Sequence, residues 1–317
     1  MIQWHQKIEE KFIMDKVSTP ILSIVTPTLG QFSEYWLQQL LAIQGEVEFI
    51  LVYPPGAVTA SVEDPRVKIF HSLYQGETAQ RAVGLLNASG QYVLALDDDD
   101  FLHPQVVALA KDYFDNFPQS WLLRLHKGGI DYLDEEKIKA PWPELPAINQ
   151  LNISRKRQDK YQDLVEVPIA PLDNPFELRL ALWPYGKRKD IHGCHLEPFN
   201  NNIWKTALVK EALDDFVRNM RIGEILTWLP LWGFDRALGL FLQAKFFQKD
   251  IYIGHWMPEP NQIRYIVKPC SMKSPRILFP SDALLVKRFP QYGYFWNLFF
   301  EELYNGIKTK IKILWKA

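Results

Sequence analysis

The sequence predicts an α/β fold in which a mainly parallel sheet carries helices on its faces. Short apolar segments rich in β-branched residues alternate with segments of helical periodicity through the first hundred residues. Consecutive parallel strands need such helices as crossovers. The composition agrees, because a chain of 317 residues that is 47% hydrophobic and 23% charged can bury a large core. Sheets of this kind bind ligands at the carboxyl ends of their strands, so the segments that follow each strand are candidates for a site.

The first half of the expected sheet follows from local patterns. The first apolar segment ends at Pro27, and Ser33 is placed to cap the helix that follows. Pro54-Pro55-Gly56 ends the second strand. The expected strands are 21–26, 47–52, 67–70 and 92–96, and the expected helices are 34–44 and 77–87.

The pattern is weaker in the second half of the chain. Residues 130–200 contain many prolines and two basic clusters, Arg155-Lys156-Arg157 and Lys187-Arg188-Lys189. We expect this stretch to form a long elaboration over the ligand-binding edge, where it would contact a variable substrate. The other expected elements are a helix after Pro104, a strand at 121–125, helices at 206–217 and 229–246, and a strand at 251–253.

Charge and cysteine content narrow the function and the location. The 36 basic residues are balanced by 37 acidic ones, so no overall field attracts nucleic acid, and we expect no nucleic-acid partner. Cys194 and Cys270 form no disulfide framework. Residues 1–20 lack the continuous apolar stretch of a signal peptide, and no segment reaches the length of a membrane span. We therefore expect a cytoplasmic protein.

Four consecutive aspartates, Asp97 to Asp100, follow the fourth expected strand. Clustered carboxylates repel one another unless a cation or protons neutralise them. Alternate residues of an extended chain point the same way, so Asp97 and Asp99 can share one ligand. Their oxygen atoms favour Mg²⁺ or Mn²⁺, and an open pair suits a cation that also binds substrate phosphates. The alternatives are an acidic turn that caps the helix after Pro104, or a structural calcium loop.

Three motifs together resemble family 2 glycosyltransferases of the GT-A fold. They are Thr26-Pro27-Thr28 after the first strand, the helix from Arg81 that closes at Ala88-Ser89-Gly90, and Leu96-Asp97-Asp98-Asp99-Asp100. The resemblance covers residues 20–125. It implies a Rossmann-like, mixed and mainly parallel sheet flanked by helices, with a C-terminal region for the acceptor.

The resemblance also assigns roles in the binding of a nucleoside-diphosphate sugar. Thr26, Pro27 and Thr28 would line the nucleotide pocket, and Arg81 would lie near the diphosphate. Asp97 and Asp99 would be the two acids of the Asp-x-Asp motif, which bind Mn²⁺ or Mg²⁺, and Asp98 would also contact the donor.

The end of the second strand departs from the family pattern. The family has an acidic pair there that recognises the base, whereas this chain has Tyr53 followed by Pro54-Pro55-Gly56. Tyr53 can stack on a base or form a hydrogen bond with it. The identity of the nucleotide is left open.

A catalytic base is expected late in the chain. Residues 233–238, Gly-Phe-Asp-Arg-Ala-Leu, resemble the family segment Gly-Glu-Asp-x-x-Leu, which makes Asp235 the candidate. Glu224, Asp214 and Asp215 are rivals, and a surface acid paired with a neighbouring cation is the structural alternative for Asp235.

Histidines supply two further candidates. His255 follows the last expected strand and is proposed as a third metal ligand, with a structural histidine as the alternative. His192, Cys194 and His195 have ligand chemistry for zinc, but no fourth ligand has a recognised spacing. We assign this cluster to an acceptor loop.

The last segment predicts an amphipathic helix with several lysines on one side. It can pack against the core or lie on anionic lipid, in which case the acceptor would be a lipid-linked sugar and the protein would be peripheral to the membrane. We expect an N-terminal extension at 1–20, a nucleotide-sugar-binding half at 21–128, an acceptor-binding and catalytic half at 129–265, and a helical tail at 266–317.

The sequence thus predicts a metal-dependent, inverting glycosyltransferase. It would move a sugar from a nucleoside-diphosphate sugar to a hydroxyl of a saccharide or lipid-linked acceptor, in cell-envelope or polysaccharide synthesis. A nucleotidyltransferase is the nearest enzyme alternative, although Thr28-Leu29-Gly30-Gln31 is not the glycine-rich basic loop of that class. An Asp-x-Asp phosphatase fits less well, because Phe101-Leu102 follows the aspartates where Gly-Thr is expected. The non-enzyme alternative is a binding protein of the same fold that has lost catalysis.

Overall fold

The computed structural model describes residues 19–155, 162–182, 188–190, 195–219, 231–268 and 278–314. Most of the expected N-terminal extension lies outside these ranges, as do Lys156, Arg157, Lys187, His192, Cys194, Glu224 and Cys270. The strands are β1 (Leu22–Pro27), β2 (Val47–Tyr53), β3 (Val67–His71), β4 (Tyr92–Ala95), β5 (Phe101–Leu102), β6 (Leu122–Arg124), β7 (Lys127–Asp131), β8 (Ile153–Ser154), β9 (Leu164–Pro168), β10 (Asn202–Lys205), β11 (Tyr252–Trp256) and β12 (Ile263–Val267). The helices are α2 (Glu34–Leu41), α3 (Glu77–Asn87), α4 (Val106–Asn116), α5 (Glu135–Lys139), η1 (Ile148–Gln150), α6 (Leu178–Leu182), α7 (Thr206–Asn219), α9 (Leu231–Lys245), α10 (Phe279–Arg288) and α11 (Gly293–Leu314).

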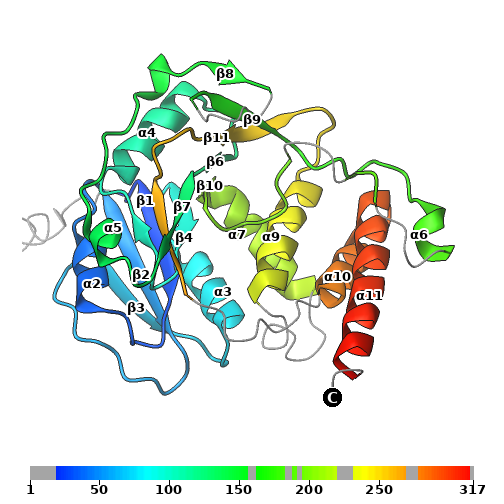
Figure 1. Cartoon of the computed structure of the whole chain (residues 1–317), viewed down its shortest axis with the longest axis horizontal. Coiled ribbons are helices and arrows are strands. Elements are labelled where there is room, and N and C mark those ends of the chain that lie inside the picture. The colour runs from blue at the N-terminus through cyan, green and yellow to red at the C-terminus, as the bar shows by residue number, and fades with distance from the viewer. Residues whose placement is uncertain are drawn as a thin grey trace, which may run out of the picture.

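The main sheet has the strand order β3-β2-β1-β4-β10-β6-β11-β9-β8 (Figure 1). Strands β3, β2, β1 and β4 are parallel to one another, and β10 is antiparallel to both of its neighbours. The expected α/β class, with a mixed and mainly parallel sheet flanked by helices, is confirmed. The antiparallel strand β10 was not predicted, because its four residues have no distinct pattern of their own.

Helices cover both faces of this sheet because its central strands are buried on both sides. Side chains of a strand alternate between the faces, so Val25 enters the core under α3, α7 and α9, whereas Ile24 enters the core under α2 and α4. Helix α3 comes very close to the sheet at Gly84, where an added Cβ would lie 2.3 Å from Val25 Cγ1. This approach fixes the helix that carries Arg81.

The expected start of α2 is confirmed by its cap. The side chain of Ser33 accepts a hydrogen bond from the backbone N–H of Trp36 at 3.0 Å, which satisfies one of the free N–H groups of the first turn. The helix after Pro104 is also present as α4, but its N-terminal cap position is Gln105 rather than one of the aspartates.

A second, three-stranded sheet has the order β5-β12-β7. Strand β12 is antiparallel to β5 and parallel to β7, so it connects the segment after the four aspartates with the segment after β6. Among the described residues, no helix has both the length and the apolar character needed to cross a membrane.

A buried carboxylate, Glu48, joins the parallel strands to the turn before β4. Its side chain is 3% exposed and accepts hydrogen bonds from Lys68 Nζ at 2.6 Å, from Ser89 Oγ at 2.7 Å and from the Ser23 hydroxyl. Burial alone would raise the pKa of Glu48, but these hydrogen bonds outweigh it and lower the pKa to about 2.

We predict that Glu48→Gln destabilises the protein by about 3 kcal/mol at pH 7. The folded pKa of Glu48 lies below its ordinary value of 4.5, so its stabilisation is present above that pH and is lost as the pH falls toward 2. Urea denaturation between pH 7 and pH 2.5 should therefore show the gap between wild type and variant closing on acidification. Glu46→Gln, at an exposed position just before β2, is the control and should change little. A gap that stays constant with pH would contradict the assignment.

Candidate active site

A cavity of about 1090 Å³ lies at the carboxyl ends of β1, β2 and β4. The loop after β1, the start of α3 and the aspartates after β4 form one side. Helix α5 and the end of β12 form the other. The polar side chains on its wall include Thr28, Gln80, Asp97, Asp98, Asp99, Lys139 and Lys268.

Hydrogen bonds between neighbouring strands hold the floor of this cavity. Gln80 Nε2 donates to the carbonyl oxygens of Thr28 at 3.0 Å and of Val52 at 2.5 Å, which ties α3 to the ends of β1 and β2. Thr28 Oγ1 donates to Asp98 Oδ2 at 2.7 Å. The loop after β1 and the aspartates after β4 are therefore fixed to each other.

Asp97 and Asp99 both line the cavity, and each has a cation beside it. Arg81 Nη2 donates to Asp97 Oδ1, and Lys268 Nζ lies 2.7 Å from Asp99 Oδ2. The side chains of the two aspartates are 36% and 37% exposed, so both carboxylates are accessible from the cavity. Two accessible carboxylates on one wall are suited to a positively charged ligand.

Arg81 is itself inaccessible. Its side chain is 1% exposed, and Nη2 also donates to Glu77 Oε1 at 3.0 Å. The sequence placed Arg81 near the diphosphate, but among the described residues it lies beneath Asp97 and does not form part of the cavity wall. Burial lowers the pKa of Arg81, but the charges of Asp97, Glu77 and Asp235 outweigh it and the pKa is raised. The guanidinium therefore stays charged.

The other two aspartates have separate partners. Burial raises the pKa of Asp98, and the hydrogen bond from Thr28 partly offsets this effect. Asp100 is 4% exposed and accepts a hydrogen bond from the Ile266 N–H at 3.1 Å, while its carbonyl oxygen accepts one from Trp36 Nε1 at 2.8 Å. Burial and the charge of Asp97 raise the pKa of Asp100 to about 8. Asp100 thus fastens β12 to the main sheet.

The residues present fit an open site for Mg²⁺ or Mn²⁺. No group of three or more His, Cys, Asp or Glu side chains within the described ranges is arranged around a common point. Mg²⁺ is commonly held by one or two carboxylates and completed by water and phosphate oxygens. Asp97 and Asp99 supply that minimal pair on the wall of a cavity large enough for a nucleotide.

Asp235 lies on helix α9, where its charge acts on Arg81. Its Oδ1 accepts a hydrogen bond from the Asn200 N–H at 2.6 Å. Burial raises the pKa of Asp235, while that hydrogen bond and the charges of Arg81 and Arg124 partly offset the rise. Arg81 therefore contacts Asp97, and its charge also acts on Asp235. Asp235 is thus within electrostatic reach of Arg81, although it does not line the cavity.

Two rivals for the role of base lie elsewhere. Asp214 is 54% exposed and pairs with Arg218 one turn along α7 at 2.9 Å. Asp215 pairs with Lys245 at 3.4 Å and with Arg288 at 3.0 Å. Both are accounted for by ion pairs at the edge of the helical layer, away from the cavity wall.

Two residues expected in the nucleotide pocket are buried in the sheet. Thr26 and Tyr53 are both 0% exposed. The Tyr53 hydroxyl accepts a hydrogen bond from the Ala60 N–H at 3.3 Å, and its ring packs beside His71. Neither side chain can touch a nucleotide in this arrangement, which corrects the assignment. Pro27 and Thr28, which follow Thr26, do line the cavity.

His255 is also corrected. It points into the core under α4, where its Nδ1 lies 2.8 Å from the Tyr113 hydroxyl and its ring lies 4.5 Å from that of Phe117. Burial lowers the pKa of His255 to about 4. It does not join Asp97 and Asp99, and its role is structural.

Sequence reasoning missed Gln80 and Lys268. Gln80 precedes Arg81 on α3, and only the position of the helix against β1 and β2 reveals its hydrogen bonds. Lys268 follows β12, whose pairing with β5 brings it to Asp99. Neither contact has a local pattern in the chain.

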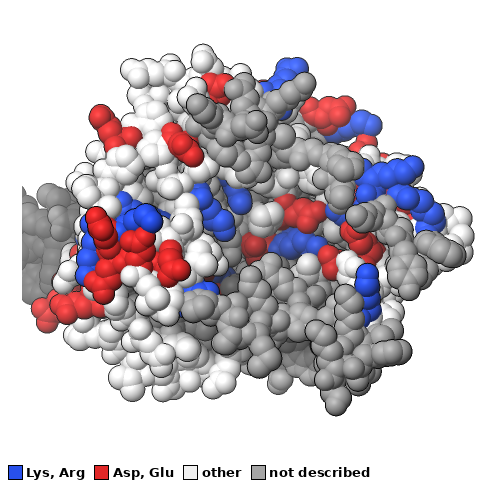
Figure 2. All heavy atoms as spheres, in the orientation of Figure 1, with Lys and Arg blue, Asp and Glu red and all other residues white. Residues whose placement is uncertain are grey.

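The surface around the site carries both signs of charge. Figure 2 shows basic and acidic side chains interspersed across this face, with no single continuous basic area among the coloured residues. This distribution agrees with the balanced composition of 36 basic and 37 acidic residues.

No protein-family model and no curated protein sequence matches the chain. Among solved structures, it is similar to S. aureus TarS 1-349 in complex with UDP, with a TM-score of 0.49 and 14% identity over 86% of this chain and 66% of that one. TarS 1-349 without a named ligand gives a TM-score of 0.48, with 14% identity over 84% and 65% of the two chains. The complex with UDP-GlcNAc gives 0.45, with 13% identity over 84% and 66%. The chain thus spans just under two thirds of the length of these structures.

Proposed function

We propose that this protein is a GT-A-type glycosyltransferase that moves a sugar from a nucleoside-diphosphate sugar to an acceptor hydroxyl. One observation carries the proposal. Asp97 and Asp99 both lie on the wall of a nucleotide-sized cavity at the carboxyl edge of a parallel sheet, and the buried Arg81 contacts Asp97 while its charge also acts on Asp235. An acidic pair for the donor and a separate, partly buried acid are two parts that such a transfer needs.

The donor half of the reaction depends on charge. Mg²⁺ or Mn²⁺ bound by Asp97 and Asp99 would neutralise the diphosphate as it leaves. Arg81 holds Asp97 in place from below, and Lys268 holds Asp99 from the side. The hydrogen bond from Thr28 to Asp98 fixes the wall against which the donor would lie.

The acceptor half depends on Asp235. We infer that its carboxylate removes the proton of the attacking hydroxyl and that the transfer inverts the anomeric carbon. The hydrogen bond from the Asn200 N–H fixes one carboxylate oxygen, which leaves the other for the acceptor. The nearby charges of Arg81 and Arg124 favour the ionised form in a buried place.

Donor binding is tested first. We expect one nucleoside diphosphate or nucleotide sugar, added with Mn²⁺ at about 100 times its Kd, to raise the melting temperature by roughly 5 °C. Asp97→Asn and Asp99→Asn should each abolish the Mn²⁺-dependent part of this shift, because each removes a charged ligand. Glu63→Gln, at an exposed position before β3, is the control and should behave as wild type. Release of pyrophosphate instead of a nucleoside diphosphate during turnover would favour nucleotidyl transfer.

The role of Asp235 predicts a pH dependence. Asp235→Asn should lower kcat about 10²- to 10⁴-fold without weakening donor binding. Only the ionised carboxylate accepts a proton, and burial raises its pKa above the ordinary value of 3.8, so activity should fall on acidification at a pH above that value. Asp214→Asn, a surface acid on α7, is the control. Wild-type activity in Asp235→Asn would transfer the role to another acid.

We also propose that the side of α6 and α11 makes peripheral contact with a membrane surface. Leu178 and Leu182 on α6 are 62% and 72% exposed, and Ile307 on α11 is 48% exposed. The two helices pack together. Arg179 and Lys308 lie beside these apolar side chains in the sequence, a combination that favours anionic lipid. A lipid-linked acceptor would then be presented at the surface.

Sedimentation with vesicles that contain phosphatidylglycerol tests this contact. We expect wild type to sediment with the vesicles and the double variant Leu178→Gln, Leu182→Gln to sediment at least threefold less. Leu73→Gln removes a leucine that is 85% exposed on the loop before α3 and should have no effect. Equal sedimentation of all three proteins would exclude α6 as the contact.

A further inference from the structure

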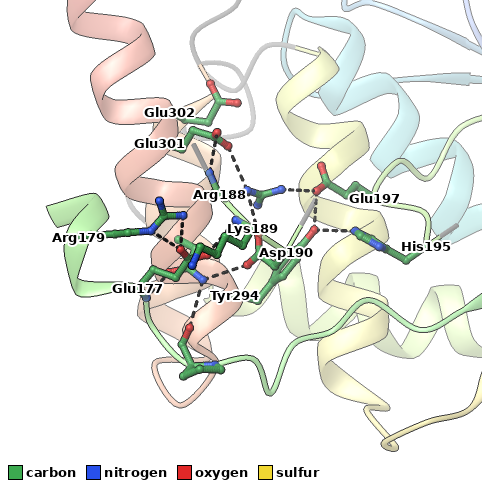
Figure 3. A network of polar contacts seen from close by, with 12 residues as sticks. Glu177, Arg179, Arg188, Lys189, Asp190, His195, Glu197, Tyr294, Glu301 and Glu302 are labelled. Atoms are coloured by element: carbon green, nitrogen blue, oxygen red, sulfur yellow. Dashed lines mark hydrogen bonds and ion pairs between the residues drawn. The ribbon is translucent and has the colours of Figure 1, made fainter. Parts of the chain in front are cut away.

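A second cavity, of about 420 Å³, lies between α9 and α11. Figure 3 shows charged side chains from α11 and from the segments 188–190 and 195–197 converging there, and Arg236 of α9 also lines the cavity. Its wall carries the polar side chains of Arg188, His195, Glu197, Arg236, Glu301 and Glu302.

Among the residues that the structure describes, acids outnumber cations around this cavity. Arg188 lies 3.3 Å from Glu197 and 3.1 Å from Glu301, and Arg236 lies 3.3 Å from Glu302. Two more carboxylates stand behind these pairs, each paired with one of the arginines. Two guanidinium groups thus face five carboxylates, those of Asp190, Glu197, Asp282, Glu301 and Glu302. An added phosphate would meet a net negative surface.

The arginines nevertheless have hydrogen-bonding capacity to spare. The side chain of Arg188 is 3% exposed, and its Nη1 has no hydrogen-bond acceptor among the described residues. The same holds for Arg236 Nε. Buried N–H groups of this kind need an acceptor, and the carboxylates beside them accept further donors. These N–H atoms are shielded from solvent, whereas the Glu301 and Glu302 side chains are 22% and 17% exposed, so a ligand with donor groups, such as hydroxyl or ammonium groups, fits this wall.

The cavity is linked to the proposed base through the backbone. Arg236 follows Asp235 on α9, and Glu197 lies shortly before Phe199 and Asn200. The N–H groups of Phe199 and Asn200 donate to the carbonyl and carboxylate oxygens of Asp235 at 3.0 and 2.6 Å. One helix and one segment thus carry both the base and the cavity wall.

We propose that this cavity binds a saccharide unit of the acceptor that is uncharged or carries an amine, and that it disfavours phosphate-bearing acceptors. The inference rests on the proposed glycosyl transfer, because it assumes that the acceptor reaches Asp235 from the cavity that Arg236 lines. The sugar hydroxyls or the amine donate to Glu301 and Glu302, whose side chains are 22% and 17% exposed. Glu197 is already occupied, since it accepts from Tyr294 as well as from Arg188.

A glycan array tests the proposal with the full-length protein. The probes are immobilised saccharides of three classes, namely uncharged, amine-bearing and phosphorylated. We expect binding to members of the first two classes and at least tenfold weaker binding to phosphorylated ones. Glu302→Gln and Glu301→Gln should each weaken binding at least fivefold, with Arg218→Gln on the surface of α7 as the control. Strongest binding to phosphorylated saccharides, unchanged binding by both glutamine variants, or no binding to any probe would overturn it.

The stabilisation by nucleotide and Mn²⁺ separates this proposal from the previous one. Glu301→Gln and Glu302→Gln should keep the wild-type shift, because neither residue lines the donor cavity. Loss of glycan binding with an intact nucleotide shift supports the second cavity. Absence of the nucleotide shift in wild type would count against the donor site, whereas the array results would still decide for or against the saccharide cavity.

Discussion

The buried guanidinium of Arg81 is the interaction on which the arrangement of the site depends. A charge that is 1% exposed is costly unless acids surround it, and Asp97, Glu77 and Asp235 supply that surrounding charge. These acids come from the end of β4, from α3 and from α9. The guanidinium therefore brings together elements that are distant in the chain. Removal of any one acid would leave the positive charge less compensated, so the arrangement of the proposed donor wall and the proposed base is tied to the stability of the protein.

The four aspartates after β4 show how one short segment serves several elements. Asp97 contacts Arg81 below the cavity, and Asp98 accepts a hydrogen bond from Thr28, which follows β1. Asp99 forms an ion pair with Lys268, which follows β12. Asp100 accepts a hydrogen bond from a backbone N–H group of β12. Each carboxylate has a different partner, which relieves their mutual repulsion without placing them around one point. Asp97 and Asp99 remain accessible, and each has one basic side chain beside it. These are the two carboxylates that we propose as ligands of a metal ion.

The sequence predicted those parts of the fold that have local patterns. Strands β1 to β4 and helices α2 and α3 each show their own periodicity, and Ser33 marks a helix start, so this half of the sheet followed directly. The assignments of Thr26 and His255 failed for a different reason. A motif gives the position of a residue along the chain, but the face on which its side chain lies depends on register and packing. Thr26 lies inside the sheet, and His255 lies under α4, where Tyr113 meets it. The contact of Lys268 with Asp99 depends on the long-range pairing of β12 with β5, so it could not be predicted from the sequence for the same reason.

Helix α9 carries both Asp235 and Arg236, and it lies close to the backbone of residues 197–199. At Gly239, an added Cβ would be 2.2 Å from the Glu197 carbonyl oxygen, so any larger residue would push the helix away. The same approach allows the Phe199 and Asn200 N–H groups to reach Asp235 and places Glu197 opposite Arg236. A shift of α9 would therefore move Asp235 and change the shape of the second cavity together. This shared dependence on one glycine is the physical reason to treat the proposed base and the proposed saccharide cavity as parts of one region rather than as independent features.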